Sequence, residues 1–289
     1  MSIKDKLFIG FQYLVPQHLL SRAAGWLADT HISWIKNPFT RWFVSHFQVD
    51  MSEALNSDPC SYNSFNEFFT RALKPGARPI SVETNAIVSP ADGTISQIGS
   101  IQGHRIIQAK GHDYSLHELL ADDEHLASNF EGGSFAVIYL SPRDYHRVHM
   151  PLTGTLQSMS HVPGDLFSVN DCTAANVPRL FARNERLVNL FESNAGQMAV
   201  ILVGAMIVAS IETVWAGQVT PVPRTVRTTL YTRTQHLEYA TGDEMGRFKL
   251  GSTVVLLFEK GRVEWLQDLR AGSALRMGQI IGRYQSDDR

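Results

Sequence analysis

The sequence is poor in the features that mark several large classes of protein. Only two of its 289 residues are cysteines, Cys60 and Cys172, which is too few for a disulfide framework and favours a reducing compartment. The formal net charge is −2, so no basic excess argues for binding to nucleic acid. The uncharged stretch Leu7–Ser21 is too short and too polar to span a bilayer.

The composition is that of a globular protein, because 44% of the residues are hydrophobic. A chain of this length can bury a substantial core in one or two domains. No repeat, low-complexity segment or linker divides the second half of the chain. We therefore expect an N-terminal helical segment over residues 1–60, followed by one catalytic domain over residues 61–289.

The first 50 residues are rich in aromatic side chains and carry more basic than acidic residues. They contain three of the five tryptophans, Trp26, Trp34 and Trp42. We expect three short helices here, broken near Pro16, around Thr30 and at Pro38. Helices that are aromatic on one side and basic on another fit an interfacial membrane anchor. The alternative is a helical layer that packs on the core and buries the tryptophans.

From about residue 80 the sequence predicts short β-strands separated by glycine, proline and aspartate. Helices are few, and Ser64-x-x-Glu67 and Ser115-x-x-Glu118 are capping-box patterns that predict helix starts. Many short strands with frequent turns indicate an α+β fold, with a mainly antiparallel catalytic domain that is barrel-like or sandwich-like. The expected strands are Ala86–Val88, Thr94–Ile98, Arg105–Ala109, Ser134–Leu140, Gly154–His161, Met198–Val203, Ile207–Thr213, Arg224–Tyr231, Thr253–Phe258 and Gln279–Tyr284.

A Gly-Ser bond stands at the entry to a buried strand, in Leu250-Gly251-Ser252-Thr253. Because glycine has no Cβ, its backbone can be approached closely, and the Ser252 hydroxyl could attack the carbonyl before it. Elimination of the resulting ester would cut the chain and leave a dehydroalanine, which loses ammonia to water and becomes a pyruvoyl group. The tetrapeptide by itself favours an ordinary strand entered through a glycine turn, so the rest of the chain has to decide.

Two further segments carry residues suited to proton transfer. Asp92 lies in the turn Pro90–Gly93 after an apolar run, where a carboxylate could orient a histidine. His146 and His149 lie three residues apart in a polar loop after the strand Ser134–Leu140. They could be structural, a metal pair or an acid–base pair. The zincin pattern His-Glu-x-x-His is absent, and no metal is expected.

Taken in order, these segments resemble the bacterial, membrane-associated phosphatidylserine decarboxylases, and the resemblance runs nearly from end to end. It is weakest over Pro221–Thr241. The matching segments are Phe65–Phe69, Pro90–Gly93, Ala109–His112, Leu140–His149, Val162–Asn170, Phe181–Arg186, Glu212–Gly217 and Glu244–Thr253.

The resemblance implies a proenzyme that cuts itself between Gly251 and Ser252 into chains 1–251 and 252–289. It implies a processing triad in which Asp92 orients His149 and His149 takes the proton of Ser252. The pyruvoyl group derived from Ser252 would form a Schiff base with phosphatidylserine and release carbon dioxide. His146 would then protonate the carbanion, and hydrolysis would free phosphatidylethanolamine.

The same resemblance implies a peripheral protein on the cytoplasmic face of the inner membrane, and a homodimer of the two-chain unit. Two other interpretations stay open. One is a hydrolase that uses Asp92, His149 and Ser252 as a stable triad, although no Gly-x-Ser-x-Gly surrounds Ser252. The other is a non-catalytic, β-rich membrane-binding module.

Overall fold

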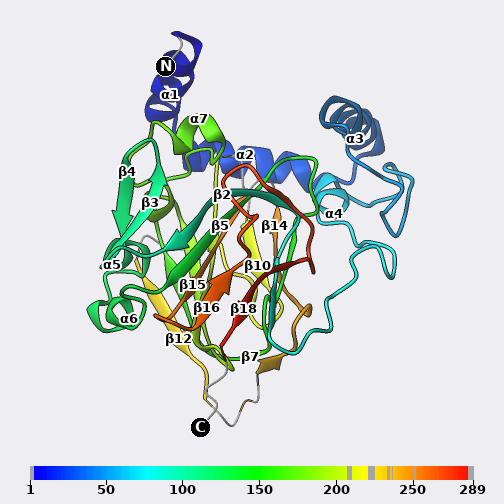
Figure 1. Cartoon of the computed structure of the whole chain (residues 1–289). Helices are drawn as coiled ribbons and strands as arrows, with labels where there is room; N and C mark the ends of the chain where they lie inside the picture. The colour runs from blue at the N-terminus through cyan, green and yellow to red at the C-terminus, as the bar shows by residue number, and fades with distance from the viewer. Residues whose placement is uncertain are drawn as a thin grey trace.

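Three helices precede a body of β-strands in the computed structural model, which describes residues 3–206, 210–220, 225–232, 235, 237–249 and 252–285. The helices are α1 (Ile3–Leu14), α2 (Gln17–Ala28) and α3 (Ser33–Phe47). α1 and α3 project from the same end of the β-body, and α2 lies between them (Figure 1). Among the described residues, no helix is both long enough and apolar enough to cross a membrane.

The expected helix breaks near Pro16 and Thr30 are confirmed, and the break expected at Pro38 is wrong. Pro38 lies inside α3. Proline at this position removes only the bond from its own nitrogen to the carbonyl of Trp34. The residues that follow are held by packing, because Phe39 and Phe43 stack against Phe65, with ring centroids 4.6 and 5.0 Å apart.

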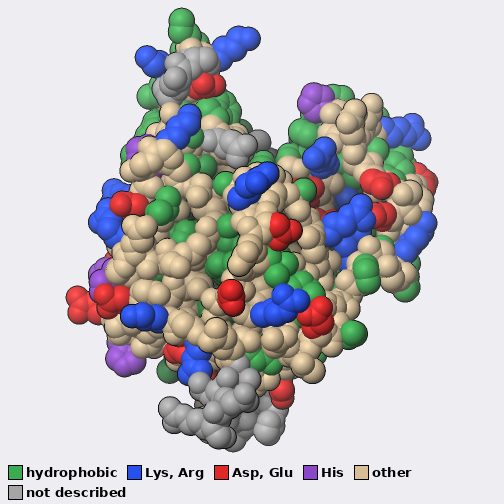
Figure 2. Space-filling view, in the orientation of Figure 1, with side chains coloured by type: hydrophobic (Ala, Val, Ile, Leu, Met, Phe, Trp, Pro, Cys, Tyr) green, Lys and Arg blue, Asp and Glu red, His purple; other side chains and the backbone are tan. Residues whose placement is uncertain are grey.

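The N-terminal helices turn polar and small side chains inward and many apolar side chains outward. The buried residues of α1 are Ile9 and Gln12, and those of α2 are Ser21, Gly25 and Ala28. By contrast, Leu14, Trp26 and Trp34 are 86%, 80% and 78% exposed. Figure 2 shows hydrophobic side chains on both helical projections, with Lys and Arg among them and a hollow between. The alternative prediction, a helical layer that buries its tryptophans against the core, is therefore wrong for Trp26 and Trp34.

Polar side chains fix α1 and α2 to the β-body. Gln12 and Gln17 each accept a hydrogen bond from a backbone N–H of the loop after β7, those of Ser168 and Leu166. The ring of His18 bonds the carbonyl of Gly164 at 2.9 Å. Helices that dock through polar groups leave their apolar faces free.

The main sheet has nine strands, and its neighbouring strands pair in the antiparallel sense. Eight of them follow the order β12-β7-β8-β9-β15-β5-β2-β17, and the ninth, β13, pairs with β7. Strand β15 lies in the middle of the sheet and is buried along its whole length. The bounds are β2 (Gly93–Ser100), β5 (Ser134–Leu140), β7 (Gly154–Val162), β8 (Arg186–Ser193), β9 (Gly196–Val203), β12 (Arg227–Leu230), β13 (Glu238–Tyr239), β15 (Ser252–Phe258) and β17 (Ala274–Leu275).

Smaller sheets and short helices complete the body. One sheet has the order β11-β10-β14-β6, another the order β1-β18-β16, and β3 pairs with β4. Their bounds are β1 (Ala86–Val88), β3 (Arg105–Ala109), β4 (His112–Ser115), β6 (Arg147–His149), β10 (Ser210–Thr213), β11 (Gly217–Gln218), β14 (Glu244–Lys249), β16 (Val263–Trp265) and β18 (Ile280–Tyr284). The short helices are α4 (Phe65–Phe69), α5 (Leu116–Leu119), α6 (Glu124–Asn129), α7 (Asp171–Ala174) and α8 (Leu180–Arg183). The expected α+β class is confirmed.

Alternate residues of β15 face two separate hydrophobic cores. Val255 and Leu257 pack in one core with Phe135 and Phe181. Val254, Leu256 and Phe258 pack in the other core. That core also contains side chains of the β1-β18-β16 sheet and of the β11-β10-β14-β6 sheet. A strand buried on both faces has no solvent face, which explains the continuous apolar run after Ser252.

Both expected capping boxes begin helices. Ser64 and Ser115 accept hydrogen bonds from the N–H groups of Glu67 and Glu118. The turn sequence Lys74-Pro75-Gly76 predicts that the helix after Ser64 ends just before it. In the structure α4 already ends at Phe69. The reason is that the next residues pair with an earlier segment, with Leu73 bridged to Ala54.

Candidate active site

Ser252 and Asp92 lie at the same end of the main sheet, on the two sides of β5. Ser252 is the first residue of β15 and pairs with Leu140, the last residue of β5. On the other side of β5, Thr94 pairs with Tyr139. Asp92 immediately precedes β2, so two strand spacings, about 10 Å, separate it from Ser252. The loop that carries the two candidate histidines leaves β5 at this end.

Ser252 is fully buried and its hydroxyl is unpaired. Its exposed fraction is 0%, and no partner among the described residues reaches its Oγ. A buried hydroxyl without a hydrogen bond is destabilising, and use in a reaction is one explanation for keeping such a group. The other half of the expected cleavage site, Gly251, lies outside the described residues.

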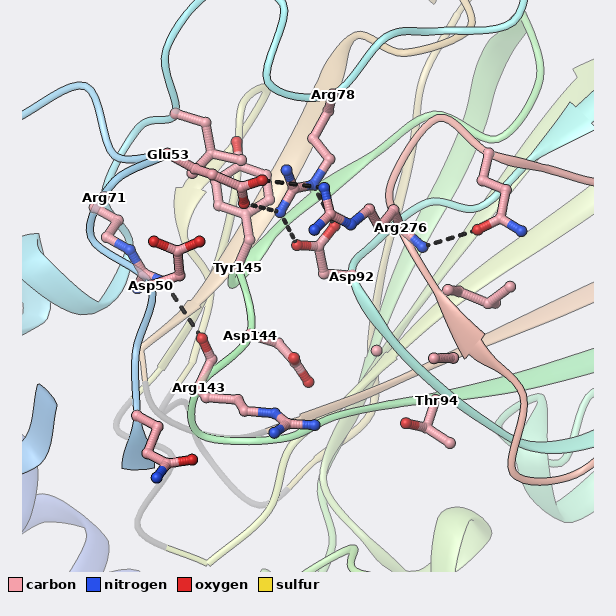
Figure 3. A pocket seen from close by; sticks show the side chains of 16 residues that line it. Asp50, Glu53, Arg71, Arg78, Asp92, Thr94, Arg143, Asp144, Tyr145 and Arg276 are labelled. Carbon is pink, nitrogen blue, oxygen red and sulfur yellow. Dashed lines mark hydrogen bonds and ion pairs between the residues drawn. The ribbon is translucent and has the colours of Figure 1, made fainter. Parts of the chain in front are cut away.

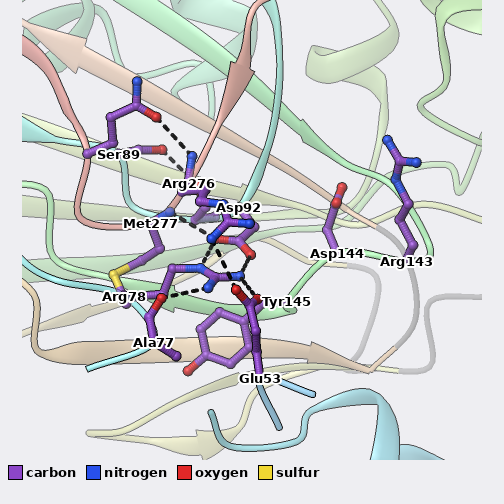
Figure 4. A network of polar contacts seen from close by, with 12 residues as sticks. Glu53, Ala77, Arg78, Ser89, Asp92, Arg143, Asp144, Tyr145, Arg276 and Met277 are labelled. Carbon is purple, nitrogen blue, oxygen red and sulfur yellow. Dashed lines mark hydrogen bonds and ion pairs between the residues drawn. The ribbon is translucent and has the colours of Figure 1, made fainter. Parts of the chain in front are cut away.

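The Asp92 carboxylate is held by Arg78 and by the far end of the chain. Arg78 donates to Oδ1 at 2.7 Å and to Oδ2 at 2.5 Å, and the Met277 N–H donates to Oδ1 at 2.9 Å. Arg78 also donates to Glu53 at 2.8 Å (Figure 4). Burial opposes the charge on Arg78, but its bonds to Asp92 and Glu53 outweigh burial and raise its pKa. The close approach of Gly93 to Tyr139, where a Cβ would lie 2.3 Å from the carbonyl oxygen, keeps this turn against β5.

His149 is bonded through both ring nitrogens. Nδ1 lies 2.8 Å from the carbonyl of Gly242, and Nε2 lies 3.0 Å from the hydroxyl of Tyr145. A carbonyl can only accept, so the neutral ring carries its proton on Nδ1 and presents a lone pair at Nε2. Burial lowers the pKa of His149, although the charge of Asp92 opposes that shift. The ring is therefore neutral near pH 7.

Asp92 and His149 are neighbours without a hydrogen bond between their side chains in the described structure. The backbone N–H of His149 donates to the carbonyl of Pro90 at 2.8 Å, which ties β6 to the Asp92 turn. The Asp92 oxygens are occupied by Arg78 and Met277, and the ring nitrogens of His149 by other groups. The fold brings these two residues to one place but does not join them directly.

His146 is completely buried in a contact with α4. Its ring stacks on Phe69 with centroids 4.0 Å apart, and its Nε2 lies 3.0 Å from the carbonyl of Ser141. Nδ1 has no hydrogen-bond partner in the described part of the chain. Burial, with a smaller effect of the Arg71 charge, lowers the pKa of His146 to about 3. His146 is therefore neutral at physiological pH.

A polar cavity of about 450 Å³ is lined by Asp92 and by Tyr145, the hydrogen-bond partner of His149, whereas Ser252, His146 and His149 are not among its lining residues. Its wall combines basic and acidic side chains from several segments (Figure 3). One of them, Asp144, is bonded by the N–H and hydroxyl of Ser141, and burial raises its pKa. The charged side chains of the wall are Asp50, Glu53, Arg71, Arg78, Asp92, Arg143, Asp144 and Arg276.

A second, apolar hollow of about 380 Å³ lies on the other side of the His146 loop. Its wall consists of apolar side chains of α2 and α3 together with Phe69, Pro142 and Met206. Two short segments, residues 69–71 and 142–145, thus separate the apolar hollow from the polar cavity. Phe69 of the first segment stacks on the ring of His146.

Comparison with known proteins gives a consistent result. The model of the family described as phosphatidylserine decarboxylase matches residues 65–283, and a second family model, described as PSD, matches residues 7–48. The chain belongs to the phosphatidylserine decarboxylase family. It is 56% identical to the phosphatidylserine decarboxylase proenzyme of Saccharophagus degradans over 98% of this chain and 99% of the relative. For the proenzyme of Alcanivorax borkumensis the identity is 55% over 100% of both chains.

Membership of the phosphatidylserine decarboxylase family confirms the resemblance seen in the sequence and the expected enzyme class, carboxy-lyase. The proenzyme of Pseudomonas putida is a third such relative, at 60% identity over 96% of this chain and 98% of the relative. The word proenzyme describes a precursor, in agreement with the expected zymogen.

The sequence interpretation missed five charged residues that line this cavity, namely Asp50, Glu53, Arg71, Arg78 and Arg276. None belongs to a pattern with a known chemical meaning, and they meet the Asp92 turn only through folding. Only Arg71 stands out in the sequence, as a charged residue two positions after a short helix that contains three phenylalanines. Within the described residues, no three His, Cys, Asp or Glu side chains cluster closely enough to hold a metal ion.

Proposed function

We propose that this member of the phosphatidylserine decarboxylase family acts through a pyruvoyl group derived from Ser252, after cutting itself between Gly251 and Ser252. One observation carries the proposal. The Ser252 hydroxyl is fully buried and lacks a hydrogen bond at the start of the central strand. Neighbouring buried residues fix that strand in register with β5 and β9, so the hydroxyl is held in place before any reaction.

In the self-cleavage, Oγ of Ser252 attacks the carbonyl carbon of Gly251, and the acyl group moves from nitrogen to oxygen. Loss of the Ser252 α-proton then expels the Gly251 carboxylate and cuts the chain. We assign the acceptance of the hydroxyl proton to His149, because its ring is neutral at pH 7 and its Nε2 carries the lone pair; the Tyr145 hydroxyl that donates to Nε2 has to turn away first. Glu244 and Asp92 supply negative charge that stabilises the imidazolium formed, and Asp92 is the one that belongs to the proposed triad.

In the decarboxylation, a pyruvoyl group at position 252 would supply an electron sink for the amine of phosphatidylserine. The chain's own residues exclude water and handle protons. His146 is placed to carry a proton, because its Nδ1 is unpaired and Phe69 fixes the ring. It is neutral without substrate, so the negative charges of an incoming headgroup are needed to raise its pKa before it can act as an acid.

We also propose that residues 1–60 rest on a membrane and that residues 61–289 form the catalytic unit. The exposed apolar side chains of α1, α2 and α3 support this division, because they would be unfavourable in water and favourable in a lipid interface. A lipid substrate requires such a position. The cytoplasmic face of the inner membrane and a homodimer of the two-chain unit complete the proposal.

Intact mass spectrometry of the purified protein tests the cleavage. We expect two chains, 1–251 and 252–289, with the smaller one lighter by one ammonia than a chain with a free N-terminal serine. Ser252→Ala should leave one full-length chain that releases no carbon dioxide from phosphatidylserine. Ser210→Ala is the matched control, since Ser210 also starts a strand and buries an unpaired hydroxyl.

Each opposite result favours one of the open alternatives. A single full-length chain in active wild-type protein would favour the hydrolase with a stable triad. A Ser252→Ala protein with every measured property intact would favour the non-catalytic module. Normal cleavage of Ser252→Ala would remove the proposed nucleophile.

A further inference from the structure

Arg71 is a buried cation without an adequate partner. Its exposed fraction is 4%, and no hydrogen-bond partner among the described residues reaches Nε or Nη1. Its one bond, from Nη2 to the carbonyl of Arg143, is 3.4 Å long and therefore weak. A buried guanidinium normally has its five N–H groups satisfied, because an unpaired charge in the protein interior is strongly destabilising.

The charges of Asp92 and Asp50 act on Arg71 from a distance, but none of the described carboxylates forms an ion pair with it. The guanidinium rests on the ring of Phe68, 5.5 Å from its centroid, and faces the polar cavity (Figure 3). Of the three other cations of that cavity, Arg78 and Arg276 are paired with Glu53, and Arg78 is also paired with Asp92. The third, Arg143, is exposed to solvent, so Arg71 is the buried cation of the cavity that has no ion pair among the described residues. Asp50 is held by the N–H of Ser52. Arg71 therefore remains available to an anion that enters the cavity.

We propose that Arg71 binds the phosphodiester of the phosphatidylserine headgroup and positions it for the reaction; this inference rests on the proposed function. The substrate offers two anions, the phosphodiester and the carboxylate. A guanidinium on the carboxylate would stabilise the ground state over a transition state that leads to neutral carbon dioxide, and would slow the reaction. The phosphodiester keeps its charge throughout, so binding it carries no such penalty.

The position of Arg71 suits this role. Arg71 follows α4 by two residues, and Phe69 of α4 stacks on His146. Arg71 and Asp92 line the same polar cavity, so a headgroup bound to Arg71 would lie beside the turn that carries Asp92. The negative charge of the same headgroup would offset the depressing effect of Arg71 on the pKa of His146.

The test measures ligand binding in the Ser252→Ala chain, which does not depend on processing. The probes are glycerophosphoethanolamine, which has the phosphodiester but no carboxylate, glycerophosphoserine, which has both, and inorganic phosphate. With Arg71→Gln we expect both diesters to bind weaker by about tenfold or more, with an intermediate loss for Arg71→Lys. Arg105→Gln, at an exposed ion pair on β3, is the matched control and should bind as the parent.

Three outcomes would overturn the proposal. If only glycerophosphoserine binding falls, Arg71 binds the carboxylate. If only inorganic phosphate binding falls, the site takes free phosphate and not the headgroup. If neither diester is affected, Arg71 is structural. A structural role also predicts that Arg71→Met lowers the melting temperature, whereas removal of an unpaired buried charge should leave it unchanged or raise it. Failure of the proposed function would appear separately, as wild-type protein that stays one chain.

Discussion

Arg78 joins Asp92 to Glu53, with one guanidinium nitrogen 2.5 Å from Asp92 Oδ2 and 2.8 Å from Glu53 Oε2. The pair is largely buried, with side-chain exposed fractions of 7% for Arg78 and 10% for Asp92. Asp92 also accepts the N–H of Met277, a residue of the expected small chain. This cluster therefore ties together the N-terminal segment, the turn before β2 and the C-terminal part of the chain.

Arg78→Met should destabilise the Ser252→Ala chain by about 3 kcal/mol at pH 7, because two carboxylates lose their shared cation. The bond from Arg78 lowers the pKa of Glu53 below its ordinary value. A lowered carboxylate pKa stabilises the folded state above the unfolded pKa, and this contribution is lost as pH falls. The effect of the substitution should therefore shrink at pH 3.5. Urea unfolding at the two pH values measures it, and an equal loss at both would contradict the assignment.

Asp92→Asn should slow self-cleavage by roughly 10²- to 10⁴-fold, because the imidazolium of His149 loses its stabilising charge. The measurement is the time course of appearance of the small chain on denaturing gels after synthesis of the precursor. Glu53→Gln is the control, since it alters the other partner of Arg78 and keeps Asp92. Cleavage of Asp92→Asn at the wild-type rate would exclude Asp92 from the triad.

The rate of self-cleavage should be independent of pH between 7 and 9 and should fall only below pH 6.5. Burial lowers the pKa of His149 from its ordinary value, and a general base works only when unprotonated. The precursor can be made in a cell-free system and transferred to buffers of different pH. A rate that rises tenfold between pH 7 and pH 8 would mean that another group accepts the proton.

His146→Gln should reduce the loss of stability on acidification of the Ser252→Ala chain. The folded pKa of His146 is about 3, below the ordinary 6.5 of an unfolded chain. The unfolded state therefore takes up a proton first, and stability falls from pH 6.5 toward pH 3. The substitution should lessen the difference between pH 7 and pH 5 by roughly 2 kcal/mol. His125→Gln, at an exposed histidine, should not change this difference.

Replacement of Trp26 and Trp34 by serine should weaken binding to vesicles that contain anionic lipid by about tenfold or more, because both side chains are exposed and would lose apolar contact with lipid. Co-sedimentation with vesicles measures the effect. The control is Val82→Ser, at an apolar residue of the β-body that is 96% exposed. Unchanged binding of the double variant would place the membrane contact elsewhere.

Local patterns predicted the strands better where both ends were marked by turn residues. Ala86–Val88, Arg105–Ala109 and Ser134–Leu140 form with the expected bounds. β8 and β14 were not foreseen, because β8 begins in a charged segment and β14 is interrupted by Gly246 and charged residues. The expected strands that begin at Ile207 and Arg224 have first residues outside the described ones, and the described parts are β10 and β12.

The candidate site shows a similar limit. Asp92, His146, His149 and Ser252 were found from local sequence, because turns, paired histidines and a Gly-Ser bond leave signals within a few residues. The partners of these groups come from distant segments: Arg78 bonds Asp92, Phe69 stacks on His146, and Gly242 bonds His149. Contacts of this kind depend on tertiary packing, and single-sequence patterns contain no information about them.

The proposed small chain, residues 252–289, contributes strands to two sheets. β15 lies between β9 and β5, β17 pairs with β2, and β18 lies between β1 and β16. If such a fragment were made separately, it would have to find these places by collision with a second molecule, with its most apolar strand in water. While it is still joined to the rest of the chain, its local concentration is fixed by the covalent link and does not depend on how much protein the cell contains. Cutting after folding would therefore give the enzyme a new chain end in its interior without the need to assemble two molecules.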